Sequence, residues 1–329
     1  MDTLPYKLLP IDELVVRMNE MGTNATPFLF IINYNTDAGY VIKGDELDDN
    51  YIKWQFHGDK STDKKINKQL EWQSHPVSQN LYAEKFNYVK KQILIGNSFL
   101  INLTQPTSIS TNYTLDDIYN FACAPYKLWL KGRFLVLSPE IFVQIKGRKI
   151  STFPMKGTID ANLPDAEKLI MQDEKEIAEH ATIVDLLRND LSMVAEDVHV
   201  TRYRYIDKIH TMQGELLQVS SEITGILPED YRNCLGSIIA KLLPAGSICG
   251  SPKHKTLEII QQIEGYDRGF YTGVCGYFDG ENLDSAVMIR FFEQTDNGLV
   301  YKSGGGITSQ SVLEKEYKEL LQKVYVPVS

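Results

Sequence analysis

The alternation of apolar and polar residues predicts a chain rich in antiparallel strands. Strands that bury one or both faces are expected at residues 134–137, 141–145, 273–278 and 286–292. Asp279-Gly280 and Asn297-Gly298 are typical hairpin turns between such strands. The C-terminal half is therefore expected to contain an antiparallel meander.

Apolar residues at helical spacing interrupt this pattern twice. In the first segment they are Ile177, Ala181, Val184, Leu187 and Leu191. In the second they are Leu313, Tyr317, Leu320, Leu321 and Val324. Ser311 and Glu314 have the spacing of a capping box, which predicts where the second helix begins. Strands and helices together predict a mixed α+β fold.

No internal repeat or low-complexity linker divides the chain. A polar and charged stretch at residues 43–73 is expected to loop out from the body of the protein. It would separate an N-terminal lobe, residues 1–80, from a catalytic region, residues 81–329. We expect the lobe and the catalytic region to form one continuous body rather than two independent domains.

Composition and charge exclude several classes of function. The 329 residues are 43% hydrophobic and 23% charged, as in a soluble enzyme, and the net charge is −9 with a pI near 5.3. Because nucleic acids and anionic lipid surfaces recruit clustered Lys and Arg, neither nucleic acid nor a membrane is an expected partner. The N-terminus has no basic and apolar targeting signal, and the four cysteines lie far apart, so a reducing, cytoplasmic location is expected.

Each predicted helix carries two glutamates three residues apart, Glu176 with Glu179 and Glu316 with Glu319. Residues at this spacing share a helix face, where two like charges repel. Four converging carboxylates would need a cation, and an all-oxygen set favours a hard ion such as Mg²⁺. Alternatively, each pair belongs to a solvated helix face, because Glu is usually exposed. The spacing alone leaves both interpretations open.

Two further features could bind an anion. Gly304, Gly305 and Gly306 could form a concavity of backbone N–H groups, although a plain turn after a strand explains them equally well. Arg290 lies inside the apolar segment 286–292. A charge buried on such a strand must be paired by a protein carboxylate or by an anionic ligand, and the pattern does not choose between the two.

Four motifs occur in order along the chain. They are Pro154-Met-Lys-Gly-Thr158, Ile183-Val-Asp-Leu-Leu-Arg-Asn-Asp-Leu191, Pro244-Ala-Gly-Ser247 with Gly250-Ser-Pro-Lys253, and Gly304-Gly-Gly-Ile307. From about Gly96 to Val326 the sequence resembles the chorismate-binding enzyme family, and the second motif is the most specific. The resemblance implies an α+β fold, with antiparallel sheets in a sandwich flanked by helices, around one site for Mg²⁺ and chorismate.

The resemblance also implies the residues of that site. The implied magnesium ligands are Glu179 and Glu319, with Glu176 and Glu316 as neighbours or water-mediated ligands. The magnesium ion would hold the ring carboxylate of chorismate. The implied substrate contacts are Arg290, Tyr271, Thr158, Lys323 and the backbone of Gly304, Gly305 and Gly306.

Lys156 decides between members of the family. The resemblance associates Lys at this place with aminodeoxychorismate synthases and Ala with anthranilate synthases. It implies that an unprotonated amine attacks C2 of chorismate with loss of the C4 hydroxyl, before ammonia attacks C4. Glu140 is implied as the acid that protonates the departing hydroxyl. The alternative for Lys156 is a structural lysine paired with a carboxylate.

Two positions depart from the patterns of relatives. Leu100 stands where isochorismate and salicylate synthases carry a lysine base and where ammonia-using members often have Gln. Gln218 stands where many relatives have a His, which anthranilate synthases use in pyruvate elimination. Leu100 therefore argues against a water-activating enzyme, and Gln218 favours a product that keeps the enolpyruvyl group.

Ammonia has to come from a partner, because the chain shows no glutaminase pattern. Cys275 lies between Gly273 and Tyr277 without the second outer Gly of a nucleophile elbow, so it is interpreted as a core thiol. A separate glutamine amidotransferase subunit is expected to supply ammonia. The expected activity converts chorismate to 4-amino-4-deoxychorismate, on the way to 4-aminobenzoate and folate. Anthranilate synthase component I and a catalytically silent chorismate-binding protein stay open as rivals.

Overall fold

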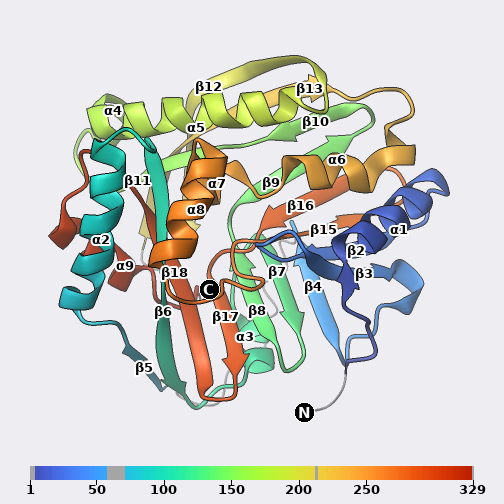
Figure 1. Cartoon of the computed structure of the whole chain (residues 1–329), viewed down its shortest axis with the longest axis horizontal. Coiled ribbons are helices and arrows are strands. Elements are labelled where there is room, and N and C mark those ends of the chain that lie inside the picture. The colour runs from blue at the N-terminus through green and yellow to red at the C-terminus, as the bar shows by residue number, and fades with distance from the viewer. Residues whose placement is uncertain (1–3, 58–70, 212–213, 328–329) are drawn as a thin grey trace.

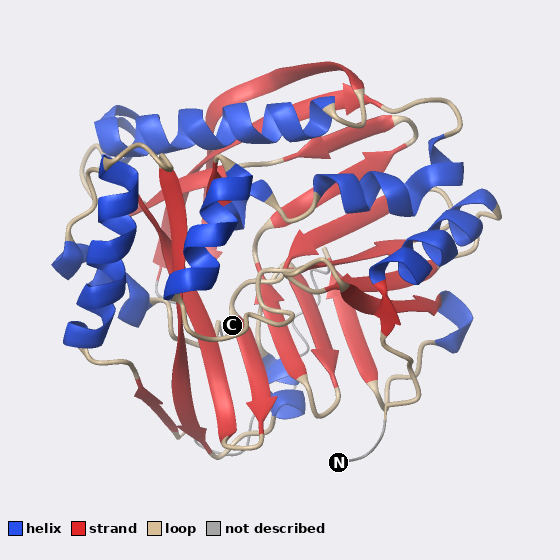
Figure 2. Ribbon diagram, in the orientation of Figure 1, coloured by secondary structure: helices blue, strands red, loops and turns tan. Residues whose placement is uncertain are grey.

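The computed structural model describes residues 4–57, 71–211 and 214–327, which form two antiparallel sheets flanked by helices (Figure 1, Figure 2). The larger, ten-stranded sheet comprises β1 (Leu9–Pro10), β2 (Phe28–Ile32), β3 (Ala38–Lys43), β9 (Ile141–Lys146), β10 (Lys149–Thr152), β11 (Met155–Asp160), β12 (Glu196–Thr211), β13 (Gly214–Ile226), β15 (Val274–Phe278) and β16 (Leu283–Val287). Its order is β1-β3-β2-β15-β16-β9-β10-β13-β11, with β12 paired to β13.

The smaller sheet has eight strands. They are β4 (Ile52–Phe56), β5 (Trp72–His75), β6 (Leu100–Thr111), β7 (Tyr126–Leu130), β8 (Phe134–Ser138), β14 (Gly250–Ser251), β17 (Phe291–Thr295) and β18 (Gly298–Ile307). Their order is β14-β6-β18-β17-β8-β7-β4, with β5 paired to β6. The mixed fold with antiparallel sheets in a sandwich is confirmed.

Helices pack around the two sheets. They are α1 (Ile11–Thr23), α2 (Gln79–Leu94), α3 (Leu115–Phe121), α4 (Ala166–Gln172), α5 (Glu174–Ser192), α6 (Leu235–Leu242), α7 (Gly246–Cys249), α8 (Lys253–Ile263) and α9 (Leu313–Gln322), with 3₁₀ turns at Gly44–Glu46 and Tyr231–Cys234. In Figure 1, α5 crosses the top of the molecule, and α2 and α9 lie at the left. Among the described helices, none is long and apolar enough to span a bilayer.

Strand β2 shows how the core is built. All five of its residues are buried, and successive side chains point to opposite faces of the sheet. Phe28, Phe30 and Ile32 pack into the cluster that includes the helices, whereas Leu29 and Ile31 pack into the cluster between the sheets. Burial of each such side chain contributes about 1.5–3 kcal/mol to the stability of the folded state. A continuous apolar run is therefore stable here because both faces of the strand are covered.

The predicted strands at 134–137, 141–145 and 273–278 are confirmed as β8, β9 and β15, and the helix over 177–191 lies within α5. The single strand over 286–292 is wrong. β16 ends at Val287 in the larger sheet and β17 begins at Phe291 in the smaller one. Arg290, with φ +50°, lies in the crossing between the sheets and not inside a strand. The apolar run continues because both sheets bury their strands.

Two smaller predictions also change. The second helix begins at Leu313 as expected but ends at Gln322, before Val324, and it has no capping box. The Ser311 hydroxyl instead accepts the backbone N–H of Thr308 at 3.1 Å. The stretch 43–73 is not one loop, since it contains β4, which pairs with β7, while residues 58–70 lie outside the described part of the chain.

Candidate active site

Lys156 lies on β11 at an irregularity in the strand. The pairing of β11 with β13 shifts register between Lys156 and Thr158, and Gly157 between them has φ +78°. Such a bulge re-aims the side chains next to it. The Nζ atom of Lys156 lies 3.8 Å from Oε2 of Glu179 on α5, and the two side chains are 23% and 10% exposed. Thr158, after the bulge, is exposed.

The first turns of α5 bring its acidic pair to the bulge. The Asp173 carboxylate caps the helix by accepting the backbone N–H of Glu176 at 2.9 Å. A methyl group placed on Gly157 would lie 3.2 Å from Oε2 of Glu176. A side chain at residue 157 would therefore press on the Glu176 carboxylate.

Gly304, Gly305 and Gly306, here called the glycine strip, belong to β18 and pair with β6. The plain-turn interpretation is therefore wrong. A methyl group on Gly306 would lie 2.9 Å from Cδ1 of Leu100 and 3.5 Å from Nζ of Lys156. At Gly306, strand β18 has no side chain, and Leu100 and the Lys156 amine occupy the space that one would take.

The acidic pair of α9 lies over the same strip. A methyl group on Gly305 would be 3.5 Å from Oε1 of Glu319 and 3.7 Å from Oε2 of Glu316. Lys323, one turn after Glu319, pairs with its carboxylate at 2.7 Å and donates to the carbonyl oxygen of Gly304 at 2.9 Å. Glu316 is buried. The two acidic pairs are thereby brought toward each other across Lys156 and the glycine strip.

The four glutamates suit a hard cation by chemistry but do not form a closed cage. Within residues 4–57, 71–211 and 214–327, no three His, Cys, Asp or Glu side chains are grouped to hold a metal ion. Mg²⁺ usually keeps several waters and takes one or two protein carboxylates together with substrate oxygens. The all-oxygen donors, arranged as two separate pairs, fit an open site of that kind.

Glu140 lies between β8 and β9 and has an enclosed carboxyl group. Its Oε1 atom accepts a hydrogen bond from the hydroxyl of Ser247 on α7. Burial raises the pKa of Glu140, and the Ser247 hydrogen bond and the charges of Lys156 and Lys323 oppose that rise. The net rise extends the protonated form of the carboxyl group to higher pH, and that is the form that an acid catalyst needs.

Arg290 and Tyr271 have the properties expected of anion-binding groups. The Arg290 guanidinium lies 5.2 Å from the ring centre of Tyr325. Among the described side chains, no carboxylate forms an ion pair with Arg290, which is half-buried. Tyr271 is 3% exposed, and burial raises the pKa of its hydroxyl, which keeps that group a neutral donor.

Sequence reasoning gave no role to His180, the neighbour of Glu179. His180 is 1% exposed, and its Nε2 atom lies 2.6 Å from the hydroxyl of Ser221, which also accepts the backbone N–H of Arg204. The pKa of His180 is lowered to about 4. Burial is the main cause, and the positive charges of Arg204 and Lys156 lower it further. A neutral imidazole thus joins α5 to β13 directly behind the acidic pair. Its position next to Glu179 was the available signal.

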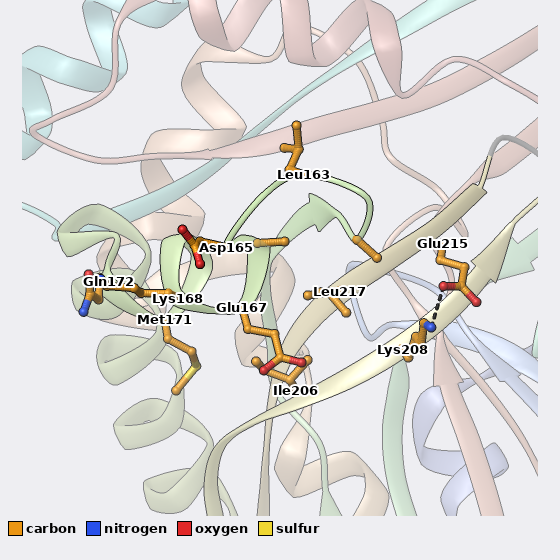
Figure 3. Close-up of a pocket in the computed structure, with 12 residues that line it drawn as sticks. Leu163, Asp165, Glu167, Lys168, Met171, Gln172, Ile206, Lys208, Glu215 and Leu217 are labelled. Atoms are coloured by element: carbon orange, nitrogen blue, oxygen red, sulfur yellow. Dashed lines mark ion pairs between the residues drawn. The ribbon is translucent and has the colours of Figure 1, made fainter.

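A cavity of about 920 Å³ lies between α4 and the β12–β13 hairpin (Figure 3). Glu167 and Met171 line it from α4, and Lys208 and Glu215 pair across the hairpin at 2.5 Å. None of the predicted catalytic or metal-binding residues lines this cavity. The cluster around Lys156, and not this cavity, is therefore the candidate active site.

Comparisons with known proteins show the family to which the chain is similar. The sequence model of the chorismate binding enzyme family matches residues 27–329. An uncharacterised PabA-like protein of Pasteurella multocida is 46% identical over 97% of this chain and 100% of its own length. Aminodeoxychorismate synthase component 1 of Escherichia coli is 32% identical over 77% of this chain and 58% of its own. Anthranilate synthase component 1 of Aquifex aeolicus is 34% identical over 74% of this chain and 52% of its own.

A solved structure is similar over nearly the whole chain. MenF, the menaquinone-specific isochorismate synthase of Escherichia coli, superimposes with a TM-score of 0.71 over 95% of this chain and 80% of its own, at 16% identity. At that identity the likeness concerns the fold. With the ordered motifs and the family match over residues 27–329, the chain belongs to the chorismate binding enzyme family.

Proposed function

We propose that the protein is a cytoplasmic aminodeoxychorismate synthase component I, which converts chorismate and ammonia to 4-amino-4-deoxychorismate for 4-aminobenzoate and folate synthesis. The observation that carries the proposal is the position of the Lys156 amine, 3.8 Å from Glu179 and beside the glycine strip. A lysine reaching into a site with carboxylates from two helices has the placement of a nucleophile.

In the proposed reaction the Lys156 amine forms a bond to C2 of chorismate while the C4–O bond breaks. The Glu140 proton leaves with the C4 hydroxyl as water. Ammonia then forms the C4–N bond while the bond between C2 and the lysine nitrogen breaks, and a proton lost by ammonia restores the Glu140 acid. The raised pKa of Glu140 supports its part in this sequence.

Glu179 and Glu319 would hold Mg²⁺, with Glu176 and Glu316 as nearby or water-mediated ligands. When bound, the ion supplies positive charge that neutralises the ring carboxylate of chorismate. Arg290 and Tyr271 would donate to the enolpyruvyl carboxylate, because the described residues give Arg290 no competing carboxylate. Leu100 presents only methyl groups beside Lys156, which favours exclusion of water from the amine.

A glutamine amidotransferase subunit would supply the ammonia. Similarity to component 1 of the Escherichia coli aminodeoxychorismate synthase supports this partner and this activity. The Aquifex aeolicus anthranilate synthase component is about equally similar, so percentage identity does not separate the two activities. Lys156 and Gln218 favour amination at C4 with the enolpyruvyl group retained.

Product analysis tests the proposal. The protein would be incubated with chorismate, ammonium and Mg²⁺, and the products separated by chromatography and weighed by mass spectrometry. 4-Amino-4-deoxychorismate is the expected product. Fluorescent anthranilate as the main product, or no turnover with any amine source, would overturn the assignment.

A further inference from the structure

Two of the ordered motifs contain charged residues that the proposed chemistry does not use. Asp190 of α5 and Lys253, the first residue of α8, form an ion pair at 2.6 Å, with side chains 7% and 18% exposed. Lys253 also donates to the carbonyl oxygen of Leu242 at 3.3 Å. A partly buried pair in such short contact fixes the relative positions of the helices that carry it.

Helix α7 packs against this ion pair. A methyl group on Gly246, its first residue, would lie 2.9 Å from Oδ2 of Asp190. At its other end, the carbonyl oxygen of Ile248 accepts hydrogen bonds from Asn102 at 3.0 Å and from Arg268 at 3.2 Å. The four residues of α7 are therefore held from several sides.

Ser247 lies between these two anchors, and its hydroxyl donates to Oε1 of Glu140. The backbone of Glu140 is fixed as well. Its N–H donates to the Ser138 hydroxyl at 3.1 Å, and its carbonyl oxygen accepts the N–H of Val287 at 3.1 Å. The hydrogen bond between Ser247 and Glu140 thus joins two supported segments.

We propose that Ser247 is a positioning residue for Glu140, held in place by the ion pair between Asp190 and Lys253. Because the serine hydroxyl donates to Oε1, the proton of the neutral acid resides on Oε2, the oxygen left for the substrate. When that proton leaves with the C4 hydroxyl as water, the same hydrogen bond stabilises the carboxylate that forms. The inference rests on the proposed acid role of Glu140 but not on which product the enzyme makes.

Other groups also act on Glu140 and would stay in place without Ser247. Lys156 approaches from β11 and Lys323 from the end of α9, and both favour the carboxylate. Tyr271 is a neutral neighbour, with its own pKa raised by burial. Removing the serine hydroxyl takes away one group that stabilises the carboxylate, so the pKa of Glu140 should rise further.

The test follows chorismate consumption against pH in wild type, Ser247→Ala and Ser247→Thr. For Ser247→Ala we expect kcat to fall about 10- to 100-fold, which is the rate loss that corresponds to losing a charge-assisted hydrogen bond in the transition state. The alkaline limb of its pH–rate profile should move to higher pH, because Glu140 then keeps its proton up to a higher pH. Ser247→Thr keeps a hydroxyl donor and should restore both the rate and the wild-type position of the alkaline limb.

The matched control is Ser237→Ala on α6, which removes a hydroxyl that accepts from Asn19 at 3.0 Å, away from the site. It should keep the wild-type rate and pH profile. A rate loss in Ser247→Ala without movement of the alkaline limb, or with no recovery in Ser247→Thr, would overturn the inference. Since chorismate loss is measured whatever the product, the result is independent of the assignment to amination.

Discussion

The Lys156 amine lies 3.8 Å from the Glu179 carboxylate, too far for a direct hydrogen bond. The contrast with Lys253, which lies 2.6 Å from Asp190, is informative. The shorter contact is typical of a lysine that holds two helices together. The longer contact is an ion pair without a hydrogen bond, so it holds the Lys156 amine less tightly, as suits a residue that must reach a substrate.

Replacing Lys156 tests this difference. Lys156→Ala should lower kcat by at least about 10³-fold and leave KM for chorismate little changed, because the other proposed carboxylate contacts do not use this side chain. Lys149→Ala, which removes a lysine with an exposed ion pair to Glu222 on the neighbouring strand, is the control. Intact-protein mass spectrometry during turnover without ammonia should find a chorismate-derived adduct on Lys156. A near wild-type rate for Lys156→Ala would show that the lysine is structural.

The acidic pairs can be tested through magnesium binding itself. Glu179→Gln and Glu319→Gln should each weaken Mg²⁺ binding by more than about 10-fold and reduce activity accordingly. Glu314→Gln is the control, since Glu314 lies exposed on the same helix as Glu319. Calorimetric titration with Mg²⁺ and the magnesium dependence of kcat are the measurements. Unchanged affinity in both variants would place the metal elsewhere.

The sequence predicted the fold best where one pattern corresponds to one element. The apolar positions of α5 and the hairpin turn at Asp279-Gly280 are set by local geometry, so periodicity and turn chemistry were enough. The run 286–292 failed because burial looks the same in either sheet, and nothing local marks the crossing at Arg290. The capping-box prediction failed because the Ser311 hydroxyl accepts the backbone N–H of Thr308 and does not cap the helix.

The candidate site was predicted through motifs rather than through geometry. Motif resemblance selected Lys156, Glu140, Glu179 and Glu319, which the fold brings to one region. It gave no role to Ser247, because its contact with Glu140 joins positions 107 residues apart. Such a contact depends on how β8, β9 and α7 pack, and no local pattern records it.

The bulge at Gly157 gives a prediction about geometry. Gly157→Ala adds a methyl group 3.2 Å from the Glu176 carboxylate at a residue with φ +78°. Gly147→Ala is a matched control, because Gly147 has φ +58° but no neighbouring atom within 4 Å. Both variants should lose about 1–2 kcal/mol of stability from the left-handed backbone. Only Gly157→Ala should also lose activity, by displacing Glu176 or the Lys156 side chain. Equal activity in the two variants would mean that this close approach does not matter for catalysis.

The pKa of Glu140 predicts a change of stability with pH. Burial raises this pKa above its ordinary value of about 4.5, so the native state keeps the proton at pH values where the unfolded chain has released it. The native state then binds more protons than the unfolded state, and the free energy of unfolding falls as pH rises through that interval. Glu140→Gln carries no titrating group and still offers an oxygen to the Ser247 hydroxyl. Its melting temperature should therefore fall less than that of wild type as the pH is raised above about 4.5, the ordinary pKa of the carboxyl group. The variant should be inactive over the same range, since it has no proton to give.

Glu314→Gln, at an exposed position, should follow the wild-type pH dependence. If Glu140→Gln follows it too, the carboxyl group is not held protonated by the fold, and its role as the acid fails with it.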